Sequence, residues 1–116
     1  MKAIVVHEFG EPDVMKWEEA TDPFAGAGEV VVRVRAAGVN PVDTYIRSGR
    51  YGAMVTPPYT PGIDAAGEVE SVGDGVQNFQ IGDRVYTAGL TQNTYAERVL
   101  VKENQLRRLP ENLSFA

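Results

Sequence analysis

Alternating apolar and polar residues recur along much of the chain and predict a protein built mainly from β-strands. In the segment EVVVRVRAAG, an extended chain places Val32, Val34 and Ala36 on one side. The same geometry places Arg33 and Arg35 on the opposite side. This pattern is typical of a strand that is buried on one face and exposed to solvent on the other.

The other alternating segments are short, and turn-forming residues separate them. Strands over 2–7 and 14–19 are predicted to form a hairpin around the turn sequence GEPD. A longer strand is predicted in GIDAAGEVESVG, and shorter ones in IGDRVYTAG and TYAERVLVKENQLRRLP. Twelve glycines and seven prolines punctuate these segments, and this succession of short strands predicts a curved, partly closed β-barrel.

One short helix interrupts the strands, and it is predicted over Pro41–Ser48. Asn40 is a favoured N-cap residue, a proline suits the first helical position, and Asp43 can return a hydrogen bond to the cap. Val42 and Ile46 lie four residues apart and are expected to pack inward. The glycine that follows suits a left-handed helix end.

Length and composition place the chain among ordinary single globular domains. Its 116 residues suffice to bury a core, and 43% hydrophobic against 23% charged residues argues against disorder. Eleven basic and sixteen acidic side chains give a net charge of −5, which disfavours nucleic acid and anionic membrane surfaces as partners. The apolar run before His7 is too short for a signal peptide and no segment is long enough to span a membrane, so a cytoplasmic location is expected.

The chain lacks most sequence signals for catalysis. Without a cysteine it has no thiolate nucleophile and no thiolate metal ligand. Its single histidine, His7, has no partner residue that predicts a catalytic pair. The sequences GAGEVV and GDGVQN do not satisfy the phosphate-binding pattern GxGxxG, and the P-loop pattern does not occur. Composition and spacing alone therefore indicate a β-rich domain and no particular reaction.

Three sequence blocks, in a fixed order, extend this interpretation. They are GEVVVRVRAAGVNPVDTYIRSGRY, PYTPGIDAAGEVESVGDGVQNFQIGDRVY and TYAERVLVKENQLRRLPENLSFA. Together they resemble the N-terminal, GroES-like domain of the medium-chain dehydrogenase/reductase superfamily, and within it the quinone oxidoreductases of the zeta-crystallin type. The resemblance extends from Lys2 to Ala116, and it implies a GroES-like, partly closed β-barrel with one short helix at about residues 41–48.

Two positions distinguish the chain from the zinc alcohol dehydrogenases that the superfamily also contains. The cysteine that binds the catalytic zinc in those enzymes falls at Asn40, and the histidine of their Gly-His-Glu motif falls at Ile63. Their cysteine-rich loop for a structural zinc has no counterpart. Zinc requires three or four N, S or O ligands, whereas Ile63 offers none and Asn40 offers a neutral amide. The resemblance therefore implies a metal-free site.

In the zinc-free branch, the resemblance implies hydride transfer from NADPH to a quinone or another conjugated carbonyl. The reaction is expected in a cleft between this domain and a nucleotide-binding domain, where hydrogen-bond donors polarise the acceptor oxygen in place of a metal. The site residues that the family analogy implies are Asn40, Tyr45 and Tyr51 as catalytic residues, Asn40 and Tyr51 as contacts of the nicotinamide, and Asp43, Asp64 and Ile63 as the supporting shell.

The resemblance also implies a larger protein. Residues 1–116 correspond to the N-terminal part of the GroES-like domain, and a Rossmann domain that binds the nucleotide is expected beyond Ala116. The chain is then expected to be a truncated part of a two-domain α/β oxidoreductase, which is a homodimer when complete, whereas the chain is inactive by itself.

Three alternatives stay open at the level of sequence. One is an enoyl reductase of the same superfamily, which shares the fold and the cofactor. Another is a non-catalytic GroES-like module with a binding or structural role, for which the acidic charge makes RNA a poor partner. The third concerns the stretch GVNPVDTYIRSGRY alone, in which Asn40 is only a helix cap and Tyr45 and Tyr51 are only rim aromatics.

Overall fold

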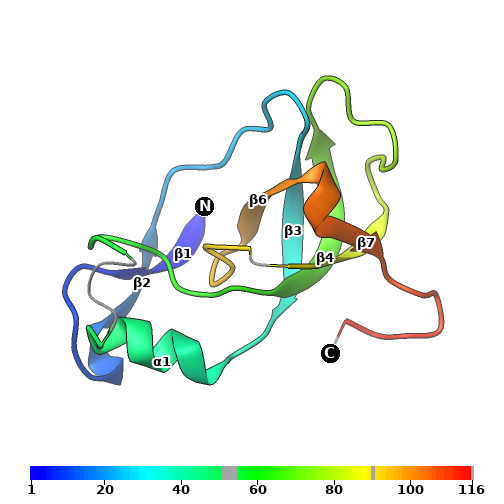
Figure 1. Cartoon of the computed structure of the whole chain (residues 1–116). Coiled ribbons are helices and arrows are strands. Elements are labelled where there is room, and N and C mark those ends of the chain that lie inside the picture. Colours follow the sequence, from blue (N-terminus) through cyan, green and yellow to red (C-terminus); the bar gives the residue numbers. More distant parts are fainter. Residues whose placement is uncertain (51–54, 90, 116) are drawn as a thin grey trace.

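The computed structural model describes residues 1–50, 55–89 and 91–115. Figure 1 shows a β-hairpin and a helix on one side of the molecule and a larger sheet on the other. The one α-helix of the described residues is α1 (Pro41–Arg47), so the expectation of a mainly β domain with one short helix is confirmed. The strands are β1 (Lys2–Val6), β2 (Met15–Glu19), β3 (Glu29–Ala37), β4 (Ala65–Val72), β5 (Arg84–Thr87), β6 (Arg98–Lys102) and β7 (Leu106–Arg108), with 3-10 turns at Pro12–Val14 and Glu103–Gln105.

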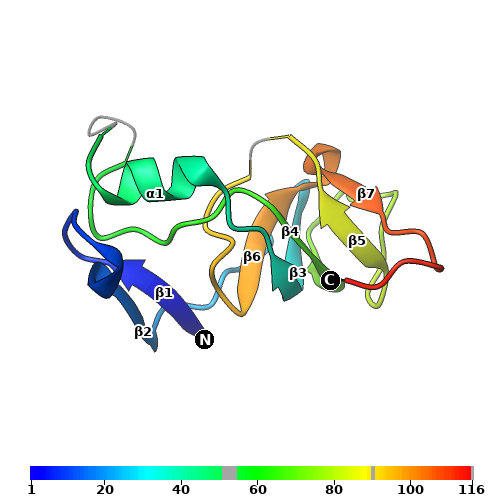
Figure 2. The same ribbon diagram turned by 90° about the horizontal axis from the view of Figure 1, so that it is seen from below.

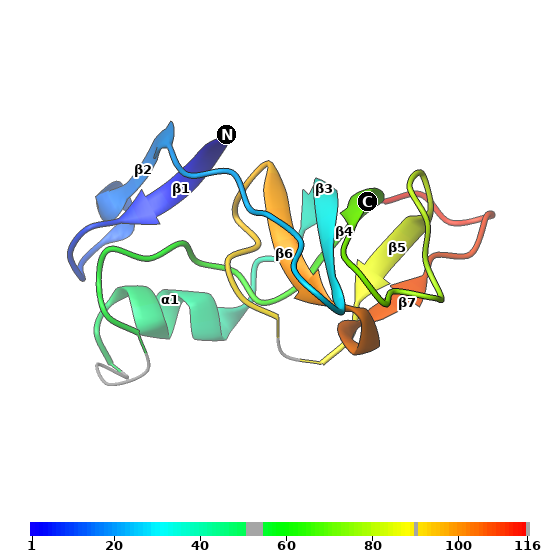
Figure 3. The ribbon, with the colours of Figure 1, turned by 90° about the horizontal axis from the view of Figure 1, so that it is seen from above.

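Five antiparallel strands form the main sheet in the order β6-β3-β4-β5-β7, and β1 pairs with β2 in a separate hairpin. The segment just before β6 connects these two parts. The N–H of Ile4 in β1 donates to the carbonyl of Tyr95 at 2.8 Å, and the N–H of Val34 in β3 donates to that of Glu97 at 2.9 Å. Figure 2 and Figure 3 show the curved succession of strands that results. The sheet is therefore a half-barrel, in agreement with the predicted partly closed barrel.

The core lies against the curved sheet, where the predicted alternation is observed. Val32 in β3 is 1% exposed, whereas its neighbour Arg33 is exposed to solvent. Burial of a valine side chain stabilises the fold by roughly 1.5–3 kcal/mol, so this cluster fixes the strands whose ends carry the site described below. The buried cluster consists of Val30, Val32, Val69, Val85, Val99, Val101 and Leu106.

Helix α1 begins at Pro41, as predicted, and ends at Arg47 with Ser48 as its C-cap residue. Gly49 follows with a φ of 85°, in the left-handed region that glycine adopts without steric penalty. An ideal Cβ at Gly49 would lie 3.2 Å from Cγ of Phe9, so the end of the helix packs closely against the hairpin. Across the described part of the chain, no helix is long and apolar enough to cross a membrane.

Close contact between β3 and β4 depends on the glycine at position 67. Gly67 pairs with Val34, and an ideal Cβ at Gly67 would overlap the carbonyl oxygen of Arg33. A carbonyl inside a sheet cannot move aside without breaking its hydrogen bonds, so the contact leaves no room for a side chain. This approach of the two backbones positions the start of β4 beside the end of β3.

We predict that Gly67→Ala lowers the free energy of unfolding by about 2 kcal/mol or more, because the added methyl group meets backbone and not a mobile side chain. Urea unfolding of the purified chain measures the change. Gly10→Ala is the matched control, since an ideal Cβ there meets the Cγ1 methyl of Val14 at 2.8 Å, which can rotate away. Equal loss of stability in both variants, or none in either, contradicts the close contact between β3 and β4.

Candidate functional site

The candidate site is organised at the start of helix α1. Asn40 has extended backbone angles, φ −116° and ψ 151°, which are typical of an N-cap residue. Its backbone N–H donates to Oδ2 of Asp43 at 2.9 Å. The backbone carbonyl of Asn40 in turn accepts from the N–H of Asp43, also at 2.9 Å. The predicted return bond from the third helical residue to the cap is therefore present.

A second carboxylate holds the side chain of Asn40. The Nδ2 atom of this amide donates to Oδ2 of Asp64 at 3.0 Å. Asp64 lies immediately before β4, and its backbone carbonyl accepts from the N–H of Gly38 at 3.1 Å. An ideal Cβ at Gly38 would overlap the Asp64 carboxylate, so glycine leaves the space that this carboxylate occupies. The neighbouring ends of β3 and β4 thus set the orientation of the Asn40 amide.

Asp43 is buried although it carries a carboxylate, with only 6% of its surface exposed. Besides the N–H of Asn40, its Oδ2 accepts a hydrogen bond from the hydroxyl of Tyr95 at 2.8 Å. Both donors are neutral, and the ion pairs found among the described residues do not include Asp43. Two charge-assisted hydrogen bonds to one oxygen therefore offset the loss of hydration of this carboxylate.

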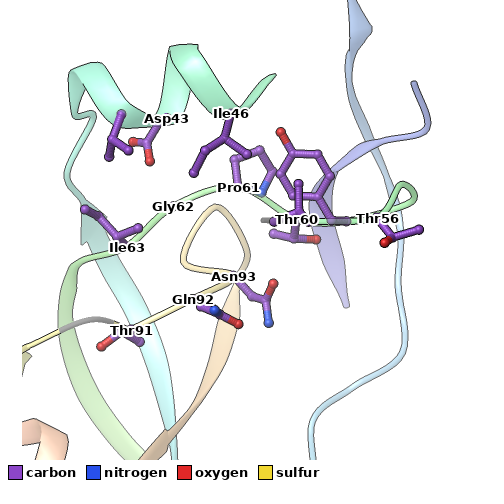
Figure 4. A pocket seen from close by; sticks show the side chains of 13 residues that line it. Asp43, Ile46, Thr56, Thr60, Pro61, Gly62, Ile63, Thr91, Gln92 and Asn93 are labelled. Carbon is purple, nitrogen blue, oxygen red and sulfur yellow. The ribbon is translucent and has the colours of Figure 1, made fainter. Parts of the chain in front are cut away.

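A pocket of about 350 Å³ opens beside the start of the helix. This volume lies at the small end of the range for ligand pockets, about 300–1,000 Å³. In Figure 4 the helix lies above the pocket, and the segment of Thr91 and Asn93 lies below it. The walls are mainly apolar and come from three parts of the chain. Among the lining residues are Val42, Asp43 and Ile46 from α1, Tyr59 and Ile63 from the segment before β4, and Thr91 from the segment before β6.

Burial raises the pKa of two tyrosine hydroxyls at this site. For Tyr95, loss of solvent is the main cause, and the hydrogen bond to Asp43 and the charge of that carboxylate raise the pKa further. For Tyr59, loss of solvent again dominates, and the positive charge of Arg47 opposes it in part. Both phenols therefore keep their proton at physiological pH. The hydroxyls of Tyr59 and Thr91 have no hydrogen-bond partner within the described ranges.

The structure brings together three of the residues that the resemblance implies for the site. Asn40, Asp43 and Asp64 form one hydrogen-bonded group. Ile63 contributes an aliphatic side chain to the pocket. The functional roles assigned to these four residues stay predictions.

The two tyrosines expected beside the acceptor are placed differently. Tyr45 is 37% exposed on the outer side of α1, and the guanidinium carbon of Arg50 lies 4.8 Å from its ring centre. Neither Tyr45 nor Asn40 is among the pocket-lining residues that the structure describes. Tyr51 lies outside the described residues. The catalytic roles of both tyrosines stay predictions.

Sequence reasoning did not single out Tyr59, Thr91 or Tyr95. Only long-range pairing brings these residues to the helix. The N–H of Val6 donates to the carbonyl of Tyr59 at 2.8 Å, and the N–H of Tyr59 donates to the carbonyl of Val6 at 3.1 Å. Tyr95 and Asp43 are 52 residues apart. Because no local pattern relates residues at that separation, the sequence carries no signal that identifies their hydrogen bond.

The site residues do not fit a zinc ion. In the part of the chain that the structure describes, no group of three or more His, Cys, Asp or Glu side chains is arranged to hold a metal. Asn40 offers only a neutral amide in place of a thiolate or imidazole ligand, and the side chain of Ile63 has no atom that can bind a metal.

A half-barrel with one capped helix and a pocket beside the helix start defines a GroES-like domain. The model of the alcohol dehydrogenase GroES-like domain family matches residues 26–111, which is most of the chain. The chain therefore belongs to this family.

The relatives within this family are oxidoreductases. The quinone oxidoreductase of Rattus norvegicus is 48% identical over 116 residues, which cover 99% of this chain and 35% of that protein. The 2-haloacrylate reductase of Burkholderia sp is 39% identical over 113 residues, which cover 96% and 34%. The structure of Escherichia coli quinone oxidoreductase complexed with NADPH matches with a TM-score of 0.90 at 35% identity, over 99% of this chain and 35% of that one. The chain thus spans about a third of the length of these relatives, and its resemblance to quinone oxidoreductases is confirmed.

We predict that Tyr95→Phe lowers the free energy of unfolding near pH 7 by about 2 kcal/mol, because it removes a hydrogen bond to a buried carboxylate. Tyr59→Phe is the matched control: it removes a tyrosine hydroxyl with no partner among the described residues, and should change stability by less than about 0.5 kcal/mol. Urea unfolding measures both variants. A similar loss of unfolding free energy in the two variants contradicts a stabilising hydrogen bond from the Tyr95 hydroxyl to Asp43.

The stability difference between Tyr95→Phe and the wild type should also narrow at alkaline pH. Burial raises the pKa of Tyr95 in the folded chain above its ordinary value of 10.0. Stabilisation that comes from a raised pKa is complete below the unfolded-state pKa and is lost as the pH rises through the folded-state pKa. The phenylalanine variant has no hydroxyl to ionise, so its stability should fall less steeply as the pH rises above 10.0, the ordinary pKa of the hydroxyl in the unfolded chain. A difference that does not change with pH contradicts the burial of this hydroxyl.

Proposed function

We propose that this chain forms the acceptor-binding wall of a zinc-independent, NADPH-dependent reductase of quinones or other conjugated carbonyls. In the complete protein a nucleotide-binding domain holds the cofactor opposite this wall, and two copies of that protein form a homodimer. The observation that carries the proposal is the Asn40 amide, which Asp64 fixes at the start of a helix that also lines an apolar pocket. Family membership and the similarity to quinone oxidoreductases support it.

The pocket suits a flat acceptor with an apolar ring. Val42, Ile46 and Ile63 supply aliphatic lining from two different segments of the chain. A quinone or enone ring that enters the pocket gains about 25 cal/mol for each Å² of apolar surface that it removes from water. Shape and apolar contact therefore supply affinity, whereas a few polar groups set the orientation of the acceptor.

Asn40 polarises the carbonyl group of the acceptor in this proposal. Its Nδ2 carries two N–H groups, of which one donates to Asp64. The other N–H can donate, in a direction that the bond to Asp64 holds constant, to an acceptor oxygen that lies at the helix start, outside the pocket lining and next to the lining residue Asp43. Hydride transfer places negative charge on that oxygen, which strengthens the hydrogen bond. The donor therefore stabilises the transition state more than the ground state.

Tyr45 and Tyr51 are included as contacts of the acceptor ring and the nicotinamide, on the basis of the family resemblance. The exposed ring of Tyr45 shares its helix with the Asn40 cap, and Val39 next to Asn40 is 77% exposed. A second domain that packs over this end of the helix would cover both apolar side chains. The cleft between the two domains would then contain the tyrosine ring and the amide together.

NADPH, when bound, supplies the hydride. In this proposal its flat nicotinamide end lies beside the Asn40 amide, whereas the described residues do not fit its pyrophosphate. The Asp43 carboxylate accepts the N–H of Asn40 at the start of α1, and its negative charge there repels a phosphate group. We therefore assign phosphate binding to the nucleotide-binding domain.

We predict that Asn40→Ser in the complete protein lowers kcat/KM for NADPH-dependent quinone reduction about tenfold or more, equivalent to about 1.4 kcal/mol of transition-state binding. Serine remains a good N-cap residue but cannot supply the amide N–H. Steady-state assays measure the effect, with Asn104→Ser, the same change at an exposed position outside the site, as a control that should keep wild-type kinetics. The isolated chain, expected to be inactive, gives the baseline. Unchanged kinetics in Asn40→Ser contradict the proposed role of the amide.

A further inference from the structure

We propose that the pocket beside helix α1 selects uncharged conjugated carbonyl compounds and rejects compounds that carry a carboxylate, and that Asp43 sets this selectivity. The identity of the pocket as the acceptor site rests on the proposed function. The effect of ligand charge, in contrast, can be measured by binding alone, without cofactor and without turnover.

The first observation is the distribution of charge around the pocket. Asp43 is the one charged side chain among the described residues that line it, and the others are apolar or carry hydroxyl or amide groups. The residues that the structure does not describe nearby in sequence, 51–54 and 90, all have uncharged side chains. The lining therefore offers no lysine, arginine or histidine in its described part to bind a carboxylate.

The second observation is that no cation forms an ion pair with Asp43 within the described ranges. Its partners, the N–H of Asn40 and the hydroxyl of Tyr95, are neutral and both bond to Oδ2, whereas Oδ1 accepts no hydrogen bond from the described residues. Arg47, one turn further along α1, directs its Nε to the carbonyl of Gly10 at 3.2 Å, and its positive charge opposes that of Asp43 at the Tyr59 hydroxyl. Asp43 lines the pocket, whereas Arg47 is not among the described lining residues, so the carboxylate is the charged group in direct contact with the pocket contents.

The size of the effect follows from the burial of this charge. At an effective dielectric constant of about 20, repulsion between two like charges a pocket-width apart corresponds to about a tenfold loss of affinity or more. Salt screens the repulsion weakly, because Asp43 is only 6% exposed. A carboxylate ligand also loses hydration in an apolar pocket without gaining a cation in exchange. A neutral carbonyl compound avoids both penalties.

Titrations of the chain with cinnamamide and cinnamate, followed by methyl NMR, test the proposal. The two probes share a flat, conjugated frame and differ in charge, since cinnamate is ionised at about pH 7.5. We expect cinnamamide to shift the methyl signals of Val42, Ile46 and Ile63 and to bind about tenfold or more tightly than cinnamate. Equal affinities, tighter binding of cinnamate, or no shift of these signals with cinnamamide contradicts the proposal.

Two pocket variants and one control locate the effect. Asp43→Asn should reduce the affinity ratio of cinnamamide to cinnamate to within about threefold, because the variant removes the negative charge. The asparagine oxygen can still accept hydrogen bonds from Asn40 and Tyr95, so the local structure is kept. Thr56→Lys adds a positive charge at an exposed lining position and should also reduce the affinity ratio, with Asp43 intact. This second variant keeps the test available if Asp43→Asn does not fold. Asp74→Asn removes an exposed carboxylate outside the lining and should leave the affinity ratio of the two probes unchanged. An unchanged affinity ratio in the pocket variants overturns the proposal.

The outcomes separate this inference from the proposed function. Selective binding of cinnamamide in a protein that shows no NADPH-dependent turnover supports the charge selectivity and rejects the reductase. Quinone reduction by the complete protein, combined with equal binding of the two probes by the pocket, supports the reductase and rejects the charge selectivity.

Discussion

The buried carboxylate of Asp43 joins the parts of this domain on which the candidate site depends. It accepts a hydrogen bond from the N–H of Asn40, the residue that caps helix α1. It also accepts one from the hydroxyl of Tyr95, which lies in the segment before β6 that pairs with β1. The capping residue, Asn40, is held in addition by Asp64 at the start of β4. Helix, hairpin and half-barrel therefore meet in one hydrogen-bonded group, whose central charge is tolerated only while its donors are in place.

This constraint relates the stability of the domain to its chemistry. Asp43 fixes the backbone of Asn40, and Asp64 fixes its side-chain amide, which is the group that we propose donates to an acceptor oxygen. The charge that these bonds stabilise is the basis on which we propose that the helix start rejects phosphate and that the pocket rejects anionic ligands. In the proposed function, this domain contacts the neutral, flat parts of the reactants, and another domain binds the charged part of the cofactor.

Local patterns predict much of this fold, whereas long-range contacts determine the site. The alternation around Val32 and the spacing from Asn40 to Asp43 are local, so the strand and the capped helix can be read from the sequence. The bond from Tyr95 to Asp43 arises only when β1 pairs with the segment before β6, and no sequence pattern specifies it. The family resemblance implied that Asp64 supports Asn40, but no local pattern predicts their hydrogen bond, because it depends on the space that Gly38 leaves between two strand ends.

Hydrogen exchange at the backbone amide of Asn40, followed by NMR, tests the central role of Asp43 most directly. Slow exchange is expected in the wild-type chain, because this N–H donates to a carboxylate that is 6% exposed. In Asp43→Ala the protection of Asn40 should be lost, while the amide of Val101, in the core strand β6, stays protected as evidence that the sheet remains folded. Exchange of the Asn40 amide at the rate of an unprotected peptide in the wild-type chain would contradict the assignment of Asp43 as the residue that joins the helix to the half-barrel.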